Sequence, residues 1–417
     1  MEFKNLTPFD ALAFGSVDKQ GRRYHVVAMS VGYQLKPQGT STPTYPTTQY
    51  EAQLIEQEPL ALVLADEHWG EPQSTSLKAQ SDLVGYKPKC DVLVLGHAYS
   101  AQAKQIFDVQ LQLEVAGKTQ IDKTLTISGP CQLHRQPGFG AGVLGSLNLS
   151  RSYRLQPAQA TDCVPLRYEL AYGGACTLSD KRHLQNPERY PQPWRINEVC
   201  YRNPVGVGWV ADGYLQSLAS SPQGLPEQMR APQIMHKGQW FEHLVQTSQS
   251  GAMDARQMAR QDYQLTSAGY GPLNRAWAPR LALAGTYDDE WRQNQAPGLP
   301  KDHDNRYNNC APQDQQIAWP DLTQGLLLQT SNLKPGGGRM QVRLPGHRAL
   351  VLADLGGARV PLPMQVDTIV LDSDKLQLRL VWRTALLQDM QAQSLELRFE
   401  VDPQAPWVKY KNMEEPA

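Results

Sequence analysis

The chain has 417 residues, of which 40 are Lys or Arg and 41 are Asp or Glu, so its formal net charge at pH 7 is -1. Because no block of like charges occurs, the charge pattern gives no support for binding to nucleic acid or to an anionic membrane. The apolar runs are far shorter than the ~18 residues that a membrane-spanning helix needs, and the first residues lack the features of a secretory signal, so we expect a cytoplasmic protein.

Two pairs of strands are predicted in the N-terminal part of the chain. Ala11–Val17 and His25–Leu35 lie on either side of a Gln-Gly turn, which predicts an antiparallel pair. Apolar and polar residues alternate in Phe107–Val115 and again from Ile121 to Ile127, with a Gly-Lys turn between them. This alternation is typical of a hairpin with one buried face.

A short buried strand is predicted between these pairs, over Asp91–Leu95. Pro88 fixes its own φ and favours extended geometry in the preceding residue, so the Lys-Pro-Lys sequence at 87–89 predicts a turn. The residues that follow are β-branched or aliphatic over the length of a strand, and Gly96 ends the run.

The middle of the chain gives weaker patterns. Pro157–Pro165 is predicted to be a polar connection, and the stretch from there to about Lys301 is dense in Pro, Gly, Trp and Tyr, which predicts loops with short helices. Ala252–Leu265 has the composition of a helix. Tyr287–Gln293 predicts a shorter helix that begins at an acidic pair, as suits a helix N-terminus.

Five strands are predicted after a Pro-Gly-Gly-Gly turn. They are Met340–Leu344, Ala349–Ala353, Thr368–Leu371, Leu376–Arg383 and Leu395–Val401. Strands at both ends of the chain favour a mainly β fold with antiparallel sheets, sandwich- or barrel-like, with long loops and a few short helices.

Four regions follow from this organisation. We expect an N-terminal β-rich lobe at 1–150, a loop-rich middle region at 151–335, C-terminal strands at 336–405 that pack with the N-terminal sheets, and a tail at 406–417. The six cysteines have no regular spacing and no Cys-x-x-Cys pair, so we expect mostly buried free thiols, no metal site and no cofactor.

One set of residues suggests catalysis. His97 follows a buried strand and titrates near neutrality, while Asp288, Asp302 and His303 lie in the middle region, so a hydrolase-type site there is one hypothesis. No Ser or Cys nucleophile with a recognisable local pattern accompanies His97. A structural histidine that hydrogen-bonds a turn is the favoured interpretation.

Several short motifs recur in a fixed order along most of the chain. They are Ser81-Asp82-Leu83 with Lys87-Pro88 and 91–99, then 165–169 with 171–174, 202–206, 268–272, 284–288 with Trp291, and 311–316. In this combination the chain resembles an uncharacterised-domain family of type VI secretion effector chaperones or adaptors, encoded beside spike and PAAR-effector genes. The segment 176–199 matches nothing in that pattern and is interpreted as a partner-specific insertion.

The resemblance implies a bacterial, cytoplasmic, non-enzymatic protein that holds a toxic effector, one with a PAAR spike-tip domain, and helps to load it onto the valine-glycine-repeat spike. It implies no catalytic residue. The motif residues that it marks as structural or partner-binding are Ser81, Asp82, Lys87, Pro88, Asp91, Gly96, His97, Tyr99, Tyr168, Glu169, Gly173, Gly174, Arg202, Asn203, Pro204, Gly206, Tyr287, Asp288, Gln313 and Gln316.

Two alternatives stay open beside the chaperone hypothesis, namely the hydrolase above and a structural component of the secretion apparatus. A chaperone needs an exposed apolar surface, and a groove lined by residues such as Trp209, Tyr214, Trp240, Phe241 and Trp277 would suit it. For any one of these aromatic residues, a core position is the favoured interpretation. The oligomeric state and the identity of the effector do not follow from the sequence.

Overall fold

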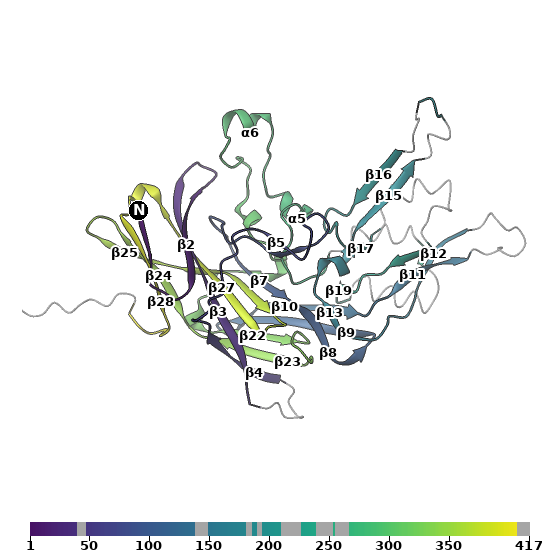
Figure 1. The fold of residues 1–417 in the computed structure, drawn as a ribbon, viewed down its shortest axis with the longest axis horizontal. Helices are drawn as coiled ribbons and strands as arrows, with labels where there is room; N and C mark the ends of the chain where they lie inside the picture. The colour runs from purple at the N-terminus through teal and green to yellow at the C-terminus, as the bar shows by residue number, and fades with distance from the viewer. Residues whose placement is uncertain are drawn as a thin grey trace, which may run out of the picture.

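The structure is a computed structural model that describes residues 1–39, 47–137, 149–180, 186–189, 194–209, 227–238, 253–254 and 267–406. The fold is β-rich, as predicted, and its main feature is a large mixed sheet that curls into a half-barrel (Figure 1).

Twelve strands form this sheet, in the order β19-β10-β9-β22-β23-β4-β3-β27-β26-β7-β21, and β2 pairs with β3 beside that path. Their bounds are β2 Asp10–Val17, β3 Arg23–Gln38, β4 Thr47–Leu54, β7 Cys90–Leu95, β9 Ile106–Val115, β10 Lys118–Ser128, β19 Ile234–His236, β21 Gln316–Ile317, β22 Leu326–Ser331, β23 Arg339–Leu344, β26 Gln365–Asp372 and β27 Gln377–Leu387.

The predicted antiparallel pairs are confirmed. β2 pairs with β3 from Asp10 to Val17, and β9 pairs with β10 along its whole length. In β9 the side chains of Val109, Leu111 and Leu113 are fully buried, whereas the residues between them are half-buried. The alternation in the sequence is therefore the alternation between core and surface.

The centre of the sheet joins strands from the two ends of the chain. β26 lies between β27, with which it is antiparallel, and β7, with which it is parallel, and β27 also pairs with β3. β7 is buried over five of its six residues. A continuous buried run, here interrupted in polarity only by Asp91, is typical of a strand that has a parallel neighbour and is covered on both faces.

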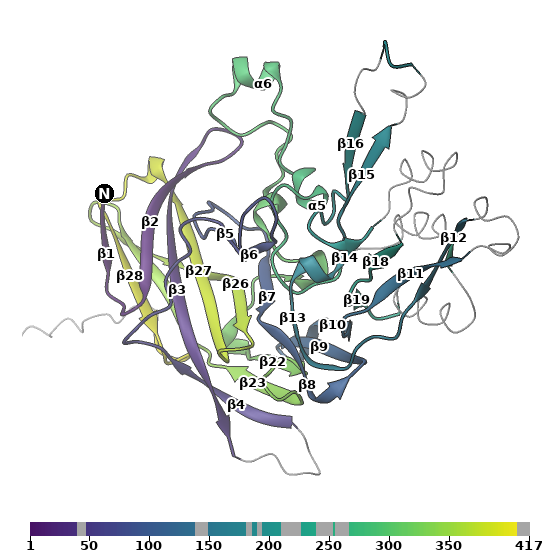
Figure 2. The ribbon, with the colours of Figure 1, turned by 45° about the vertical axis from the view of Figure 1, so that its right-hand side comes forward.

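A second sheet has four strands in the order β1-β28-β24-β25 and lies beside the β2–β3 end of the large sheet (Figure 2). Its bounds are β1 Glu2–Asn5, β24 Arg348–Asp354, β25 Arg359–Pro363 and β28 Ser394–Glu400. The two sheets share one hydrophobic core, in which Phe9 and Phe399 meet edge to face with ring centroids 4.8 Å apart.

Smaller sheets and short helices complete the fold. The strands are β5 Glu67–His68, β6 Leu77–Ala79, β8 His97–Lys104, β11 Gln132–Pro137, β12 Leu149–Leu155, β13 Thr161–Pro165, β14 Tyr172–Gly173, β15 Ala175–Asp180, β16 Trp194–Val199, β17 Val207–Gly208, β18 Gln228–Arg230 and β20 Met253–Asp254. The helices are α5 Ala278–Leu281, α6 Asp289–Asn294, and the 3-10 turns η1 Tyr168–Leu170, η4 Asn305–Asn308, η5 Gln313–Gln315, η6 Leu322–Gln324 and η7 Gln388–Met390.

Three local predictions for the middle region have different outcomes. The short helix predicted at Tyr287–Gln293 is confirmed as α6. The polar connection predicted at Pro157–Pro165 is wrong at its end, where β13 pairs with β8. Of the helix predicted at Ala252–Leu265, only Met253 and Asp254 are described, and they form β20 instead, while the rest lies outside the described residues.

The cysteines are free, and Cys90, Cys131, Cys200 and Cys310 are buried. Along the part of the chain that the structure describes, no helix is both long enough and apolar enough to cross a bilayer.

Candidate functional site

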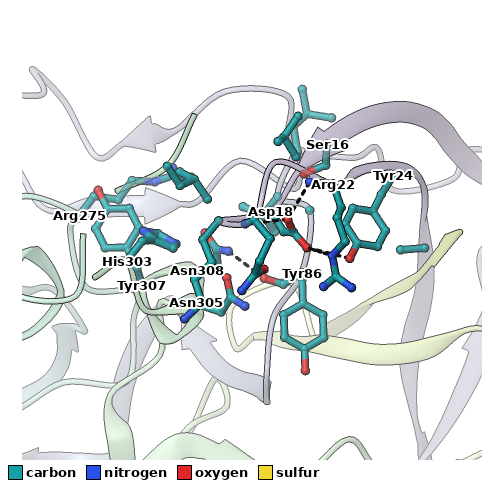
Figure 3. Close-up of a pocket in the computed structure, with 18 of the residues that line it drawn as sticks. Ser16, Asp18, Arg22, Tyr24, Tyr86, Arg275, His303, Asn305, Tyr307 and Asn308 are labelled. Atoms are coloured by element: carbon teal, nitrogen blue, oxygen red, sulfur yellow. Dashed lines mark hydrogen bonds and ion pairs between the residues drawn. The ribbon is translucent and has the colours of Figure 1, made fainter. Parts of the chain in front are cut away.

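A cavity of about 560 Å³ opens between the β2–β3 turn, the segment 83–86 and the segment 275–308 (Figure 3). Aromatic, amide and cationic side chains dominate its lining, namely Tyr24, Tyr86, Tyr287, Tyr307, Asn305, Asn308, Lys19, Arg22 and Arg275. Leu83, Tyr86 and Tyr287 are exposed at 40%, 44% and 53%, so large apolar groups face water at this cavity.

The β2–β3 turn forms one wall, and Asp18 organises it. Its carboxylate accepts hydrogen bonds from the backbone N–H groups of Gln20 and Arg22, from the Arg22 side chain at 2.8 Å and from the Tyr24 hydroxyl at 2.9 Å. Although burial acts in the opposite direction, these hydrogen bonds hold the pKa of Asp18 below its usual value. These hydrogen bonds fix the shape of the turn, and both oxygens of the Asp18 carboxylate accept hydrogen bonds within it.

Tyr86 forms the facing wall. Its carbonyl accepts a hydrogen bond from the Asn308 side chain at 2.8 Å, and its ring meets Trp319 edge to face at 5.7 Å between centroids. The indole of Trp319 in turn donates to the Lys87 carbonyl at 3.1 Å. The ring of Tyr86 is thus held in position while part of its surface stays open to water.

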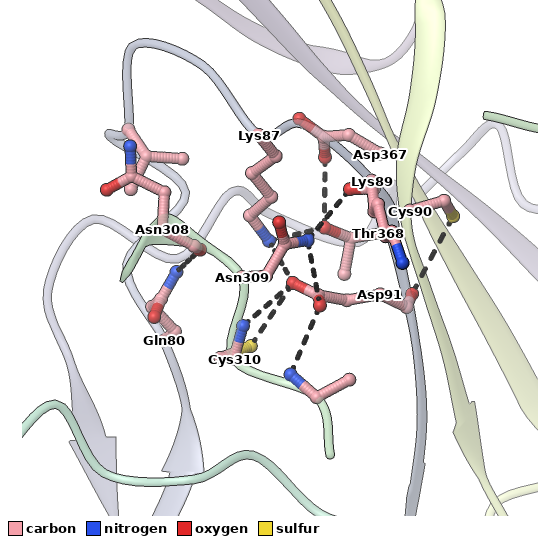
Figure 4. Close-up of polar contacts among 12 residues, drawn as sticks. Gln80, Lys87, Lys89, Cys90, Asp91, Asn308, Asn309, Cys310, Asp367 and Thr368 are labelled. Atoms are coloured by element: carbon pink, nitrogen blue, oxygen red, sulfur yellow. Dashed lines mark hydrogen bonds and ion pairs between the residues drawn. The ribbon is translucent and has the colours of Figure 1, made fainter. Parts of the chain in front are cut away.

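Behind this wall lies a buried polar cluster built on Lys87 and Asp91 (Figure 4). The Lys87 ammonium is 2.9 Å from the Asp91 carboxylate and 2.8 Å from the Thr368 hydroxyl, and the two side chains of the ion pair are 3% and 0% exposed. Burial alone would lower the pKa of Lys87, but the Asp91 carboxylate raises it above its usual value. The Lys87 ammonium therefore stays charged at neutral pH.

The same carboxylate fixes the chain segment that leads to the cavity. Asp91 accepts hydrogen bonds from the Asn309 side chain at 3.0 Å and from the backbone N–H groups of Cys310 and Ala311 at 3.0 and 3.1 Å. Burial raises the pKa of the Cys310 thiol to about 12, so this cysteine is a weak nucleophile. Since η4 directly precedes Asn309, the cluster positions Asn305 and Asn308 at the cavity.

Arg280 supports the segment from its other side. This guanidinium is 3% exposed and donates to the carbonyls of Leu273 and Tyr307 at 2.6 and 2.7 Å and to the Gln80 side chain. It thereby joins α5, the end of β6 and the Tyr307 backbone. The sequence analysis did not identify Arg280, because nothing next to it in the chain marks it as buried.

Gly96, between β7 and β8, and His97 and Tyr99, in β8, contact the turn between β26 and β27, and none of the three lines the cavity. Asp374 accepts hydrogen bonds from the His97 ring at 2.8 Å and from the Tyr99 hydroxyl at 2.7 Å. Gly96 has φ +107°, and a Cβ there would lie 2.4 Å from the Ser373 hydroxyl. These three motif residues therefore fix the position of the β26–β27 turn, which is distant from them in the sequence.

Asn203 is the centre of a second buried group. It is fully buried, and its side chain donates to the carbonyls of Tyr168 and Tyr172 at 2.8 and 3.1 Å. Its own carbonyl accepts hydrogen bonds from Gly174 and Gly206. At Gly173, with φ +150°, an added Cβ would lie 2.2 Å from that carbonyl, so only glycine permits this approach. Pro204 is half-buried in the same loop.

Ser81, Asp82 and Glu169 each hold a nearby loop. Ser81 donates to the Leu64 carbonyl at 3.0 Å, and its N–H donates to Asp66. Asp82 is 2.7 Å from the Arg379 guanidinium. Glu169 accepts hydrogen bonds from the N–H and hydroxyl of Ser76, at 2.7 and 2.6 Å. Pro88, in the turn before β7, is half-buried.

The remaining motif residues lie on or near the surface. Tyr287 lines the cavity, and Asp288 caps α6 by accepting from the Trp291 N–H at 2.8 Å. Arg202 and Gln313 line a second cavity of about 930 Å³, and Gln316 donates to the Ala311 carbonyl at 2.8 Å. Of the motif residues marked as structural or partner-binding, only Tyr287 lines the first cavity, and Leu83 of the Ser81-Asp82-Leu83 motif lines it as well.

The four side chains of the hydrolase hypothesis do not meet at one place. His97 bonds Asp374, Asp288 caps α6, and the hydrogen bonds of Asp302 come from the backbone and side chain of Thr286. Only His303 lines the cavity, and its ring bonds the Ala284 carbonyl at 3.0 Å. Within the described residues, no three His, Cys, Asp or Glu side chains are grouped so that they could hold a metal ion.

Trp277 lies in the core, the position favoured for each aromatic residue of the suggested groove taken singly, since it is 4% exposed and packs edge to face on Tyr168. Trp209 is half-buried, whereas Tyr214, Trp240 and Phe241 lie outside the described residues. The tyrosines that do line the cavity are spread over four segments of the sequence. Their only shared pattern is that each lies in or beside a polar turn, which does not distinguish a site from a loop.

A family model described as an uncharacterized protein conserved in bacteria (DUF2169) matches residues 20–383 of the chain. No curated protein and no solved structure matched it.

Proposed function

We propose that this chain, which belongs to the DUF2169 family of proteins conserved in bacteria, is a non-enzymatic chaperone or adaptor for a type VI secretion effector. It binds the effector, which carries a PAAR domain, in the cytoplasm and helps to load it onto the valine-glycine-repeat spike. The ordered motifs described in the sequence analysis support this assignment, and the composition of the tyrosine-lined cavity supports protein binding.

That cavity is the observation on which the proposal depends. Leu83, Tyr86 and Tyr287 stay exposed although burial of such apolar surface is favourable by roughly 25 cal/mol per Å². Tyr and Arg are enriched in protein interfaces, and Asn and Ser add adaptable hydrogen bonds. Tyr, Arg, Asn and Ser all occur in this lining, so it suits a polypeptide partner.

The test is affinity capture of the tagged protein from lysate of its own bacterium, followed by identification of the proteins that co-purify. We expect one spike-associated toxin in stoichiometric amount, and loss of that toxin when the gene of this chain is deleted. Tyr86→Ala combined with Tyr287→Ala should reduce capture about tenfold or more, because truncation of an interface tyrosine removes a main anchor.

Tyr201→Ala is the matched control, since Tyr201 is 71% exposed and does not line the cavity. It should capture the toxin as the wild type does. A clean preparation with no stoichiometric partner contradicts the proposal. Recovery of the chain as a stoichiometric part of secreted particles would instead favour a structural component of the apparatus.

A further inference from the structure

β2 is an edge strand of the large sheet. All eight of its residues pair with β3 without a register shift, and no other strand of the described residues pairs with it. In an antiparallel pair, the backbone groups that do not face the partner strand point outward. One side of β2 therefore presents N–H and C=O groups that an added strand can use.

The other edges of the large sheet, and those of the sheet β1-β28-β24-β25, are protected, whereas β2 is not. β25 carries Pro361 and Pro363, β1 has only four residues and includes Lys4, and β19 and β21 have three and two residues. Short length, proline and lysine are the usual means of preventing strand addition. By contrast, β2 has eight residues, pairs regularly with β3 and contains neither proline nor lysine.

The side chains of β2 also favour a partner. Its one charged residue is Asp10, which accepts a hydrogen bond from the Leu62 N–H at 2.7 Å. The carboxylate of Asp10 therefore already has a hydrogen-bond partner within the protein. Leu12 and Val17 are 37% and 44% exposed. An added strand would cover part of this apolar surface.

The charges at the end of β2 indicate the chemistry of the partner. Ser16 and Val17 line the tyrosine-lined cavity, so the strand edge is continuous with it. Three cations line the cavity, Lys19, Arg22 and Arg275, against the single carboxylate of Asp18. Asp18 pairs with Arg22, and Arg275 pairs with Asp66, which lies outside the lining. The charge of Lys19 is not balanced by a carboxylate of the lining, so the cavity has an excess of positive charge.

We propose that β2 accepts an extended segment of the protein partner as an added strand, and that acidic residues at one end of this segment lie in the cavity beside Lys19. Backbone hydrogen bonds to β2 supply affinity, and the cavity selects the acidic end. This inference rests on the proposed function, because the segment belongs to the bound effector.

The probe is a phage library of random linear peptides of about twelve residues, long enough to cover β2 and reach the cavity, selected on the full-length protein. We expect enriched peptides with alternating apolar residues and acidic residues at one end. Synthetic copies should bind the wild type, and Leu12→Lys combined with Gly15→Lys should weaken binding about tenfold or more, because both positions are exposed on β2 and neither lines the cavity. Val401→Lys is the control, since Val401 is 55% exposed and lies outside β2.

Hydrogen exchange gives a second readout that does not depend on a substitution. In the peptide complex, the outward amides of residues 10–17 should exchange more slowly, because they gain hydrogen bonds. Equal affinity for the wild type and the double lysine variant, or unchanged exchange at residues 10–17, would overturn the inference. So would a dimer of the free protein that the double lysine variant abolishes, because the occupant of β2 would then be a second copy.

The two proposals fail separately. If the double lysine variant captures the toxin as well as the wild type does, strand addition at β2 is wrong and the chaperone function stands. If no toxin is captured by the wild type but acidic peptides bind β2, the site is correct and the assignment to secretion is wrong.

Discussion

The Lys87–Asp91 ion pair shows how a motif residue can hold distant parts of the fold together. Both charges are removed from water, and such burial is unfavourable enough that the pair adds little net stability. The carboxylate also binds two backbone N–H groups, however, so its removal leaves several buried partners without an acceptor.

We therefore expect Asp91→Ala to lower the free energy of unfolding by about 3–5 kcal/mol, since it leaves a buried ammonium unpaired. Chemical denaturation at pH 7 measures this change. Asp289→Ala is the control, because Asp289 pairs with Arg292 at 81% and 71% exposure, and such pairs contribute at most ~1 kcal/mol. A soluble Asp91→Ala protein with normal stability that fails only in partner binding would show that Asp91 acts in recognition.

Gly96 tests the role of the β7–β8 turn. Gly96→Ala should destabilise the fold by more than the ~1–2 kcal/mol of an unfavourable backbone conformation, because the new Cβ would also meet Ser373 at 2.4 Å. Gly357→Ala separates the two effects, since Gly357 has φ +124° and no atom within 4 Å of its added Cβ. Equal losses in thermal melts of the two variants would show that the contact with Ser373 relaxes without penalty.

His236 gives the protein a defined pH dependence. Burial, aided by the Lys123 ammonium, lowers its pKa from 6.5 to about 4. The unfolded chain therefore binds a proton at this residue below about pH 6.5, whereas the folded protein binds it only near pH 4. The stability that comes from neutral His236 is complete above pH 6.5 and declines as the pH falls toward 4.

The variant His236→Gln isolates this effect. Between pH 7 and pH 5, its unfolding free energy should fall by about 2 kcal/mol less than that of the wild type, because glutamine does not titrate. Urea denaturation at the two pH values measures both declines. Identical declines would mean that His236 is not protected from water as its surroundings indicate.

At the scale of elements, local chemistry can be tested at α6. Asp288→Ala should lower the opening free energy of the Trp291 amide by about 1 kcal/mol, because it removes the N-cap hydrogen bond. Hydrogen exchange at Trp291 measures this, and the global melting temperature should not change since α6 contains no buried residue. Asp289→Ala, one residue later, is the control. If both variants exchange alike, the cap hydrogen bond does not stabilise the helix.

The elements that the sequence predicts best are those with a strong period. β9 alternates cleanly because one of its faces is buried, and the short helix α6 begins with acidic residues. β13 was missed because only one of its residues is buried and its pairing with β8 depends on a distant strand.

The candidate site was less predictable than the fold. Tyr287 was in the motif set, but Tyr24, Tyr86 and Asn308 carry no local pattern, and they meet only because β3, the 83–86 segment and η4 are brought together by tertiary structure. The Lys87–Asp91 pair, four residues apart, lay within one motif, whereas its partner Asn309 is more than 200 residues away. Only the fold reveals such distant partners.

At the scale of the whole molecule, the two ends of the chain form one sheet. β3 lies between β27 and β4, and β7 lies between β26 and the two-residue β21. The regions 1–150 and 336–405 therefore share hydrogen bonds at the centre of the sheet, although the four-region division itself stays a prediction.

A fragment of residues 1–335 should consequently fail to fold, because β3 and β7 each lose a long partner strand. Circular dichroism and denaturant titration of the purified fragment measure this outcome. A chain without residues 1–5 is the control, since it loses only β1, which pairs with a single strand. A cooperative unfolding transition of the 1–335 fragment would show that the N-terminal strands form an independent unit.

The late position of β26 and β27 in the sequence also determines when the large sheet can be completed during translation. On the ribosome, β3 and β7 emerge first, and at ~5–20 residues per second the strands that complete their sheet follow on the order of tens of seconds later. Until then the edges of β7 and β3 that later bind β26 and β27 stay open, and nascent chains on one messenger are close neighbours. The chain therefore passes through a long interval with open strand edges during each round of translation.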